Sequence, residues 1–176
     1  METRAGDEAR LLDHRAFRRF VNTVAVVGVA VGDAVNAMAA EWCTPVSIEP
    51  RLLGVYIGDT RYTGELMDQA TVFGISLLSD RQAHLAHLLG SWSGRERNKA
   101  AEIGNQLEWG AVERVPLVRD AQAQYECRIH SRTGLGDHIL VVGAPVAARI
   151  NGQAAPLLYH GGTYHRLGPL IPKTDR

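Results

Sequence analysis

The first half of the chain alternates between short apolar runs and segments with helical spacing. Residues 23–31 are rich in Val, with two Ala and a Gly, and such a β-branched run is typical of a strand. The Gly-Asp pair at 32–33 is a turn signal, so residues from Val35 onward are expected to return as the second strand of a hairpin. The runs at 52–57 and 72–78 predict two more buried strands.

Three segments carry helical signals. Apolar residues spaced along one face predict a short helix over 10–20. A second short helix is predicted over 62–69, with Thr60 as its N-cap. A third is predicted to follow Ser79 and to run to Leu89, with Gly90 as its stop signal.

The second half of the chain is dominated by strand signals, after a polar stretch over 91–101. Strands are predicted at 123–130, 138–150, 156–159 and 163–167, with turns at 134–137 and 151–152. No repeat or linker divides the chain. The pattern predicts a single domain over 1–176, mostly β with attached helices, in which the strands form an antiparallel barrel.

Composition narrows the class of protein. The 176 residues are 45% hydrophobic, which is enough for a real core. Nineteen basic residues balance 19 acidic ones, so bulk positive charge does not favour nucleic-acid binding. The longest apolar run, 24–31, is far too short to span a membrane, and the charged N-terminus is not a signal peptide. We therefore expect a cytoplasmic protein that binds neither membrane nor nucleic acid.

The two cysteines, Cys43 and Cys127, match no zinc spacing, and we expect no metal site. One disulfide between them is arithmetically possible. Cys43 has no basic neighbour in sequence to stabilise a thiolate, and no G-x-S-x-G elbow supports a hydrolase. No G-x-G-x-x-G or P-loop element is present.

Residues 36–47 form the first candidate segment. The segment starts like a strand and is dense in small residues, which let a flat ligand lie against the backbone. Pro45 is expected to fix the exit from this strand. The alternative is an ordinary edge strand with Trp42 packed on the core.

Three further segments favour anion binding or proton handling. Residues 61–63 place a guanidinium and a hydroxyl at a predicted helix start, where unpaired N–H groups attract anions. Residues 91–99 combine hydroxyls, Gly, Arg and Lys, a composition that suits a phosphate. Residues 136–138 (Gly-Asp-His) supply an imidazole able to orient or shuttle a proton. An ordinary helix cap, a solvated loop and a hairpin turn are the respective alternatives.

In this order, the segments resemble the flavin reductase-like family, which has the FMN-binding split-barrel fold, and within it the flavoredoxin or DIM6/NTAB-type group. The family pattern is N-x-M-T-x-S-W-x-x-P-V-S, then R-Y-T-x-E-L, S-G-R-x-x-D-K, E-C-R, G-D-H and P-L-L-Y. The matching residues, spread over about 14–168, are Asn36, Met38, Trp42, Pro45, Ser47, Arg61, Tyr62, Thr63, Glu65, Leu66, Ser93, Gly94, Arg95, Lys99, Glu126, Cys127, Arg128, Gly136, Asp137, His138, Pro156, Leu157, Leu158 and Tyr159.

The resemblance implies a homodimer that holds FMN near the subunit interface, with FAD as an alternative flavin. It implies that residues of the first segment line the flavin ring and the start of the ribityl chain: Met38, Ala39, Ala40, Glu41, Trp42, Cys43, Thr44, Pro45 and Ser47. It further implies that Tyr62 and Thr63 hold the ribityl or phosphate end and that Ser93, Gly94, Arg95 and Lys99 grip the phosphate. His138 is implied near the ring or the nicotinamide, as the one candidate for catalytic proton handling.

Four positions depart from the family pattern. Ala39 replaces Thr and Glu41 replaces Ser, which removes two hydroxyls from the ring segment. A carboxylate near the flavin would lower its reduction potential, although neighbours on a strand alternate faces and Glu41 can equally point outward. Asn98 replaces Asp and Ala100 replaces an aromatic residue, so a looser phosphate loop is expected.

Three functions are compatible with this sequence. The leading hypothesis is an NAD(P)H-dependent flavin reductase, in which NADH or NADPH passes hydride to FMN and electrons continue to a partner monooxygenase or another acceptor. The second is an electron-transfer flavoprotein reduced by a protein partner. The third is a flavin-binding protein without turnover.

Overall fold

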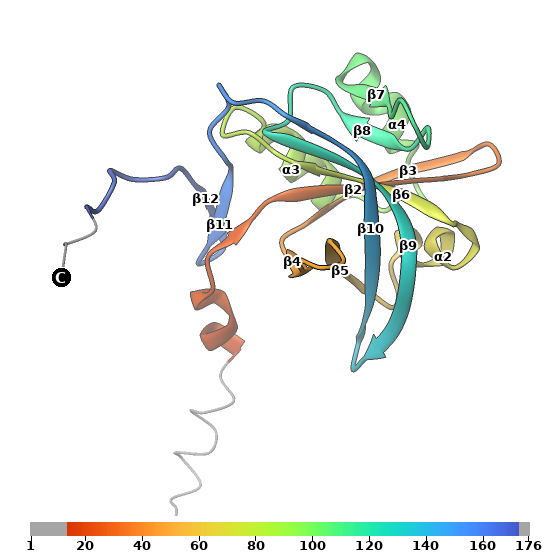
Figure 1. Cartoon of the computed structure of the whole chain (residues 1–176), viewed down its shortest axis with the longest axis horizontal. Helices are drawn as coiled ribbons and strands as arrows, with labels where there is room; N and C mark the ends of the chain where they lie inside the picture. Colours follow the sequence, from red (N-terminus) through yellow and green to blue (C-terminus); the bar gives the residue numbers. More distant parts are fainter. Residues whose placement is uncertain (1–13, 173–176) are drawn as a thin grey trace, which may run out of the picture.

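A computed structural model describes residues 14–172, and it places an antiparallel seven-stranded sheet at the centre of the molecule (Figure 1). The strands lie in the order β3-β2-β6-β9-β10-β5-β4. Their bounds are β2 Ala25–Val31, β3 Ala34–Ala40, β4 Cys43–Ser47, β5 Leu52–Gly58, β6 Val72–Leu77, β9 Ala123–Leu135 and β10 His138–Ile150.

Smaller elements surround this sheet. The β11–β12 hairpin pairs with β1 in a second sheet, and β7 pairs with β8 in a third. The remaining bounds are η1 His14–Arg19, β1 Asn22–Thr23, α2 Tyr62–Gln69, α3 Ala83–Ser91, α4 Lys99–Ile103, η2 Gly104–Gln106, β7 Leu107–Trp109, β8 Pro116–Val118, β11 Leu158–His160 and β12 Thr163–His165.

The predicted antiparallel, mostly β fold with attached helices is confirmed. Every strand pair in the central sheet is antiparallel, beginning with the β2–β3 hairpin, whose turn includes Gly32 at φ +56°. The two ends of the strand order, β3 and β4, are not hydrogen-bonded to each other, so the sheet curves without closing into a continuous barrel.

Two opposed glycines let β8 cross the central sheet. Gly28 of β2 pairs with Gly74 of β6, and a Cβ at either position would collide with the carbonyl of Pro116. The absence of side chains here brings β8 against the sheet. Because β8 lies this close to the sheet, its residue Val118 is buried and packs in the core with Val26 of β2 and Leu89 of α3.

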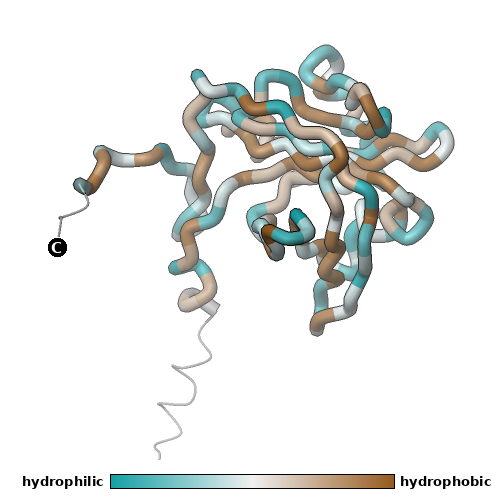
Figure 2. The backbone as a smooth tube through the Cα atoms, in the orientation of Figure 1, coloured by the Kyte–Doolittle hydropathy of each residue, from teal (hydrophilic) through white to brown (hydrophobic). Residues whose placement is uncertain are grey.

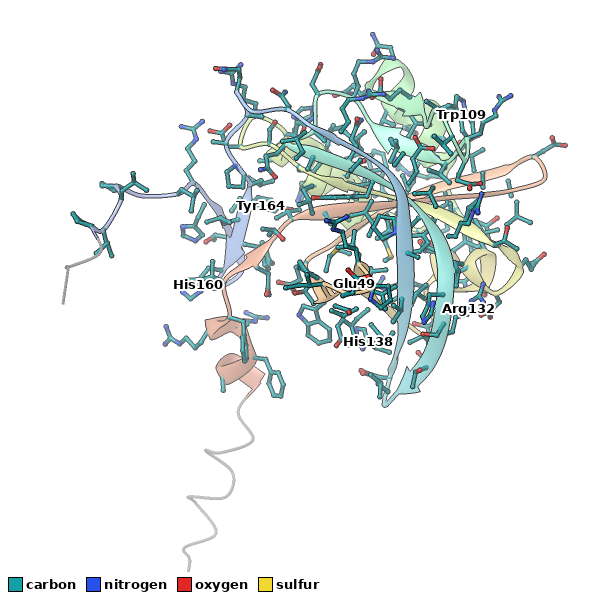
Figure 3. All side chains as sticks on the ribbon, viewed as in Figure 1. Glu49, Trp109, Arg132, His138, His160 and Tyr164 are labelled. Atoms are coloured by element: carbon teal, nitrogen blue, oxygen red, sulfur yellow. The ribbon has the colours of Figure 1, made fainter. Side chains whose placement is uncertain are left out.

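Helix α2 is held from its C-terminal end by β9. The Arg132 guanidinium donates hydrogen bonds to the carbonyl of Met67 at 3.1 and 2.6 Å and to that of Ala70 at 2.6 Å (Figure 3). These carbonyls lie where a helix leaves acceptors unpaired and where a cation is favoured. The opposite end of α2 is tied to the end of β5, where the N–H of Arg61 donates to the carbonyl of Gly58 at 2.9 Å.

The predicted starts and stops of the helices needed correction. Arg61, not Thr60, is the N-cap of α2, and it makes no side-chain cap bond. Helix α3 begins after Gln82 rather than after Ser79, because Ser79 forms a β-bridge with Pro156 and donates to the Gln82 side chain. The helix also continues through Gly90, showing that one glycine does not end a helix whose apolar face is buried.

The predicted N-terminal helix is also corrected. Within the described residues it is the 3₁₀ helix η1, and the predicted positions 10–13 lie outside the described residues. Phe17 and Phe20 are about two-thirds exposed, so this segment buries no apolar face against the described chain. The C-terminal segment likewise carries exposed Leu170 and Ile171 away from the body (Figure 2).

The first candidate segment bends where a continuous strand was expected. Strand β3 ends at Ala40, the chain bends at Glu41, and the edge strand β4 starts at Cys43. Pro45 therefore lies inside β4, beside a register shift, rather than at the exit of a strand. An edge position tolerates proline because one side of the strand has no partner.

Glu126 ties a loop to the central sheet. This nearly buried carboxylate accepts hydrogen bonds from the backbone N–H groups of Ala111, Val112 and Glu113 at 2.9, 2.9 and 2.6 Å. A neighbouring ion pair joins Arg128 to Glu113. The Glu-Cys-Arg motif thus has a structural role, since both charged residues fasten the same loop.

Within residues 14–172, no helix is long and apolar enough to cross a membrane. The same residues contain no group of three or more side chains suited to hold a metal ion.

We predict that Glu126→Gln lowers the free energy of unfolding by about 2–4 kcal/mol, because three backbone N–H groups lose their charged acceptor on a buried side chain. Glu113→Gln is the control: it removes only the ion pair with the exposed Arg128, and we expect a loss below about 1 kcal/mol. Denaturant unfolding of both variants measures the difference. Equal losses would contradict the anchoring role of Glu126.

Candidate functional site

The described residues enclose a cleft of about 520 Å³ at the end of the central sheet. Strand β3 and the bend after it form one wall, and α2, α3 and the loop before α4 form the other. The lining residues are Met38, Ala39, Ala40, Glu41, Trp42, Tyr56, Gly58, Thr60, Arg61, Tyr62, Thr63, Leu89, Gly90, Trp92, Ser93, Arg95, Lys99 and His138.

One part of the cleft is flat and partly apolar. Small side chains of β3 line it, and Trp42 stands beside them with its ring centroid 4.7 Å from that of His138. Tyr56 meets Trp42 edge to face at 6.2 Å. Such a surface suits an aromatic ring system, because ring faces pack against it without leaving polar groups unpaired.

His138 is oriented by its neighbour in sequence. Its Nδ1 lies 2.7 Å from Oδ1 of Asp137, in the turn between β9 and β10 (Figure 3). The hydrogen bond to His138, followed by the charge attraction to it, lowers the pKa of the Asp137 carboxyl. With Nδ1 engaged, Nε2 is the ring nitrogen left for other contacts.

The other part of the cleft holds a buried cation. Lys99 is only 3% exposed, and its Nζ donates one hydrogen bond, of 2.7 Å, to the carbonyl of Leu89. Burial, reinforced by the charge of Arg61, lowers the pKa of Lys99 to about 8. A lysine is almost never this buried unless it is paired, and no carboxylate among the described residues pairs with it. The ammonium group therefore has donors to spare for an anion.

The two arginines that line the cleft differ in the ion pairs and hydrogen bonds that they already form. Arg95 is already bound: it forms an ion pair with Glu65 and donates to the carbonyl of Thr60 at 3.0 Å. Arg61 forms no ion pair with another described residue. The charge available to a ligand therefore comes from Lys99 and Arg61, and Arg95 braces the loop against α2.

The loop before α4 approaches the sheet closely through Gly94. A Cβ at Gly94 would collide with Oδ1 of Asn36 and lie 2.8 Å from the Tyr62 ring. Asn36 itself is buried, donates to Oγ1 of Thr63 at 2.8 Å, and leaves its Oδ1 without a partner. Gly94 thus supports the cleft without lining it.

Asn98 keeps the start of α4 ordered. Its Oδ1 accepts a hydrogen bond from the N–H of Ala101 at 3.1 Å, which is the cap that an Asp would also supply. The departure at this position therefore preserves the cap next to Lys99.

Eleven of the residues predicted at the site line this one cleft. They come from all four candidate segments: Met38, Ala39, Ala40, Glu41, Trp42, Tyr62, Thr63, Ser93, Arg95, Lys99 and His138.

The cleft lining does not include Cys43, Thr44, Pro45, Ser47 or Gly94. The first four belong to β4, beyond the bend, where the chain turns to pair with β5. Burial raises the pKa of Cys43 to about 12, so its thiol stays protonated and is no nucleophile. Both cysteines are free, so the structure contains no disulfide between them.

Sequence reasoning missed several lining residues. Arg61 and Trp92 stand inside the candidate segments, and their neighbours were chosen instead. The others carry no polar motif or come from outside the segments: Tyr56, Gly58, Thr60, Leu89 and Gly90. The sequence does indicate the Arg61 guanidinium as an anion-binding group at the helix start, but the family resemblance assigns the flavin contacts there to Tyr62 and Thr63.

Comparison with known proteins agrees with the family resemblance that the sequence motifs indicate. A family model described as "Flavin reductase like domain" matches residues 17–168. The chain is 34% identical to an uncharacterized protein of Archaeoglobus fulgidus over 61% of each chain, so it spans less than two-thirds of that relative.

Two relatives with named activities are covered more fully. The NADH-dependent FMN reductase AsuE2 of Streptomyces nodosus subsp. asukaensis is 32% identical, over 93% of this chain and 88% of its own. The structure is similar to that of BorF, the flavin reductase component of a bacterial two-component tryptophan halogenase. That match has a TM-score of 0.81 and 30% identity, and it covers 92% of this chain and 99% of BorF. With its matching family model, its fold and the convergence of its motifs on one cleft, the chain belongs to the flavin reductase-like domain family.

Proposed function

We propose that the protein is an NAD(P)H:flavin oxidoreductase that holds FMN in the 520 Å³ cleft. The observation that carries this proposal is the buried ammonium group of Lys99, which opens onto the same cleft as the flat wall of β3. The names of AsuE2 and BorF support the reductase activity.

The residues present fit a flavin phosphate. A dianionic phosphate requires charge-assisted donors, which Lys99 and Arg61 supply, and Ser93 adds a hydroxyl. Because the Lys99 ammonium makes a single hydrogen bond, to Leu89, an incoming phosphate oxygen gives it the counter-charge that it lacks in the cleft. FMN carries this group as a terminal phosphate, and FAD carries a diphosphate in its place.

The remaining residues orient the reactants. The small side chains of Ala39 and Ala40 leave room for a ring beside Met38, and Trp42 and His138 line one side of that space. A bound flavin supplies the hydride-accepting chemistry, and NADH or NADPH supplies the hydride. His138, held by Asp137, is placed to orient the donor or to hold a proton at Nε2.

The proposal extends to protein partners. We infer a homodimer with the flavin site near the subunit interface, as the family resemblance implies. The exposed apolar side chains of Val46 and Ile48 next to the cleft-bearing sheet edge support such a contact. The similarity to BorF, the flavin reductase component of a two-component halogenase, supports delivery of reduced flavin to a second protein that uses it.

We predict that the FMN-loaded protein loses its flavin absorbance near 450 nm when it is mixed with NADH or NADPH in a stopped-flow instrument without oxygen, at a rate at least about 10²-fold above that of free FMN. A loaded protein that neither nicotinamide bleaches would contradict the reductase and favour the electron-transfer flavoprotein. Absence of flavin binding would favour a protein without turnover.

Lys99→Ala is predicted to weaken FMN binding by about 1–3 kcal/mol, the scale of one charge-assisted hydrogen bond. Riboflavin, which lacks the phosphate, is the matched ligand, and its affinity should not change. Arg81→Ala serves as the control variant, since Arg81 is an exposed cation outside the lining of the cleft. Isothermal titration measures both ligands, and an equal loss for riboflavin would remove Lys99 from the phosphate site.

The affinity for FMN should also fall as the pH rises above about 8, where the free protein's Lys99 loses its proton. Below that pH the ammonium is charged and its attraction to the phosphate is complete. Above it, the dissociation constant should rise by at most about tenfold per pH unit, while that of Lys99→Ala stays nearly flat. Titrations between pH 7 and 9.5 provide the comparison, and parallel curves for the two proteins would refute the assignment.

A further inference from the structure

A second cleft, of about 410 Å³, continues from the first. The two clefts share five lining residues, namely Ala39, Ala40, Glu41, Arg61 and Gly90. The second cleft then leads away between α3 and the C-terminal hairpin β11–β12. Nothing in the proposed flavin site uses this extension.

Glu41 stands at the junction of the two clefts. It is the sole carboxylate among the described residues that line either one, and it forms no ion pair with another described residue. Arg61 shares the junction with it. The lining at the junction thus includes one acceptor-only carboxylate and one guanidinium.

Aromatic side chains line the far part of the second cleft. The rings of Tyr159 and Tyr164 lie 5.4 Å apart, and Tyr164 stands on the exposed hairpin (Figure 3). Glu41 and Tyr164 line the same cleft. Burial raises the pKa of Tyr164, and the charges of Tyr159 and Glu41 raise it further. His87 of α3 lines the opposite side.

We propose that the second cleft binds the adenosine diphosphate half of a dinucleotide, with Glu41 accepting hydrogen bonds from the hydroxyls of the adenosine ribose. This inference rests on the proposed function, since it extends the flavin cleft. The chemistry matches part by part: the tyrosines offer ring faces to the adenine, Glu41 offers two oxygens to a vicinal diol, and Arg61 offers its fork to the diphosphate.

The carboxylate also makes the cleft selective. A ribose whose 2′ position carries a phosphate brings about two further negative charges next to Glu41, and it replaces a donor with an acceptor. Like charges in a partly desolvated cleft repel strongly. Glu41 therefore favours NADH over NADPH if the diphosphate belongs to the donor.

Two probes that differ by one phosphate test this selectivity. ADP-ribose and 2′-phospho-ADP-ribose are titrated calorimetrically into the FMN-saturated protein. ADP-ribose should bind at least about tenfold more tightly, and Glu41→Gln should reduce that ratio to below about threefold. Glu102→Gln, on the exposed side of α4 and outside both clefts, should keep the wild-type ratio.

A second variant keeps the test independent of any change at the flavin. Tyr164 lines the second cleft and does not line the first. Tyr164→Ala should therefore weaken the binding of ADP-ribose about fivefold while the affinity for FMN stays constant. Circular dichroism confirms the fold of each variant. An unaltered ratio in Glu41→Gln, or unaltered ADP-ribose binding in Tyr164→Ala, would overturn the inference.

The source of the diphosphate is settled by comparing FAD with FMN. If FAD itself fills the cleft, it binds more tightly than FMN, Tyr164→Ala abolishes that gain, and ADP-ribose fails to bind the FAD-saturated protein while still binding the FMN-saturated one. If the donor fills the cleft, FAD and FMN bind alike and ADP-ribose competes with NADH. ADP-ribose that does not bind the FMN-saturated protein at all would overturn the inference, and flavin bleaching by NADH would still leave the proposed function standing.

Discussion

The arrangement of the cleft depends on one buried charge. Lys99 places an ammonium group in a nearly solvent-free position, where one backbone carbonyl is its hydrogen-bond partner and Arg61 raises the cost of its charge. A buried charge is costly without a counter-ion, so the folded protein favours binding of an anion next to the Lys99 ammonium group. Three elements create it together: the Asn98 cap starts α4 at Lys99, the end of α3 presents the Leu89 carbonyl, and the start of α2 contributes Arg61.

The same three elements meet the strand that supplies the flat wall. Strand β3 ends in the two small residues Ala39 and Ala40, and the chain bends at Glu41 before β4 begins. Arg132 and Glu126 act at a distance from the cleft: one holds α2 by its C-terminal carbonyls, and the other fastens the loop that leads into β8. The proposed phosphate site and the proposed ring site are thus built on elements that hydrogen bonds tie to the central sheet, as positioning of a cofactor requires.

Local sequence was a good guide to the strands and a weaker one to the boundaries. The strands β2 and β10 were predicted because each contains a run of apolar, β-branched residues. Such a run indicates a strand locally, without knowledge of the strand that pairs with it. The start of α3 was misplaced because Ser79 is drawn into a bridge with Pro156, a contact made between distant parts of the chain. The residues of the site were likewise predictable where a local motif marks them, and unpredictable where contacts between distant parts of the chain bring them in. Short motifs located Lys99 and His138, whereas Tyr56 and Leu89 entered the cleft through sheet order and helix packing, which short motifs do not encode.

The central claim is that the Lys99 ammonium is the partner of a flavin phosphate. Its titration is directly observable by heteronuclear NMR of protein labelled at the lysine side chains, with Lys99→Met assigning the signal. In the free protein Lys99 should titrate near pH 8. With FMN bound, its pKa should rise by at least about one unit, because an adjacent anion favours the charged form, and riboflavin should produce no such rise. A Lys99 pKa that is identical in the free and FMN-bound protein would contradict the account.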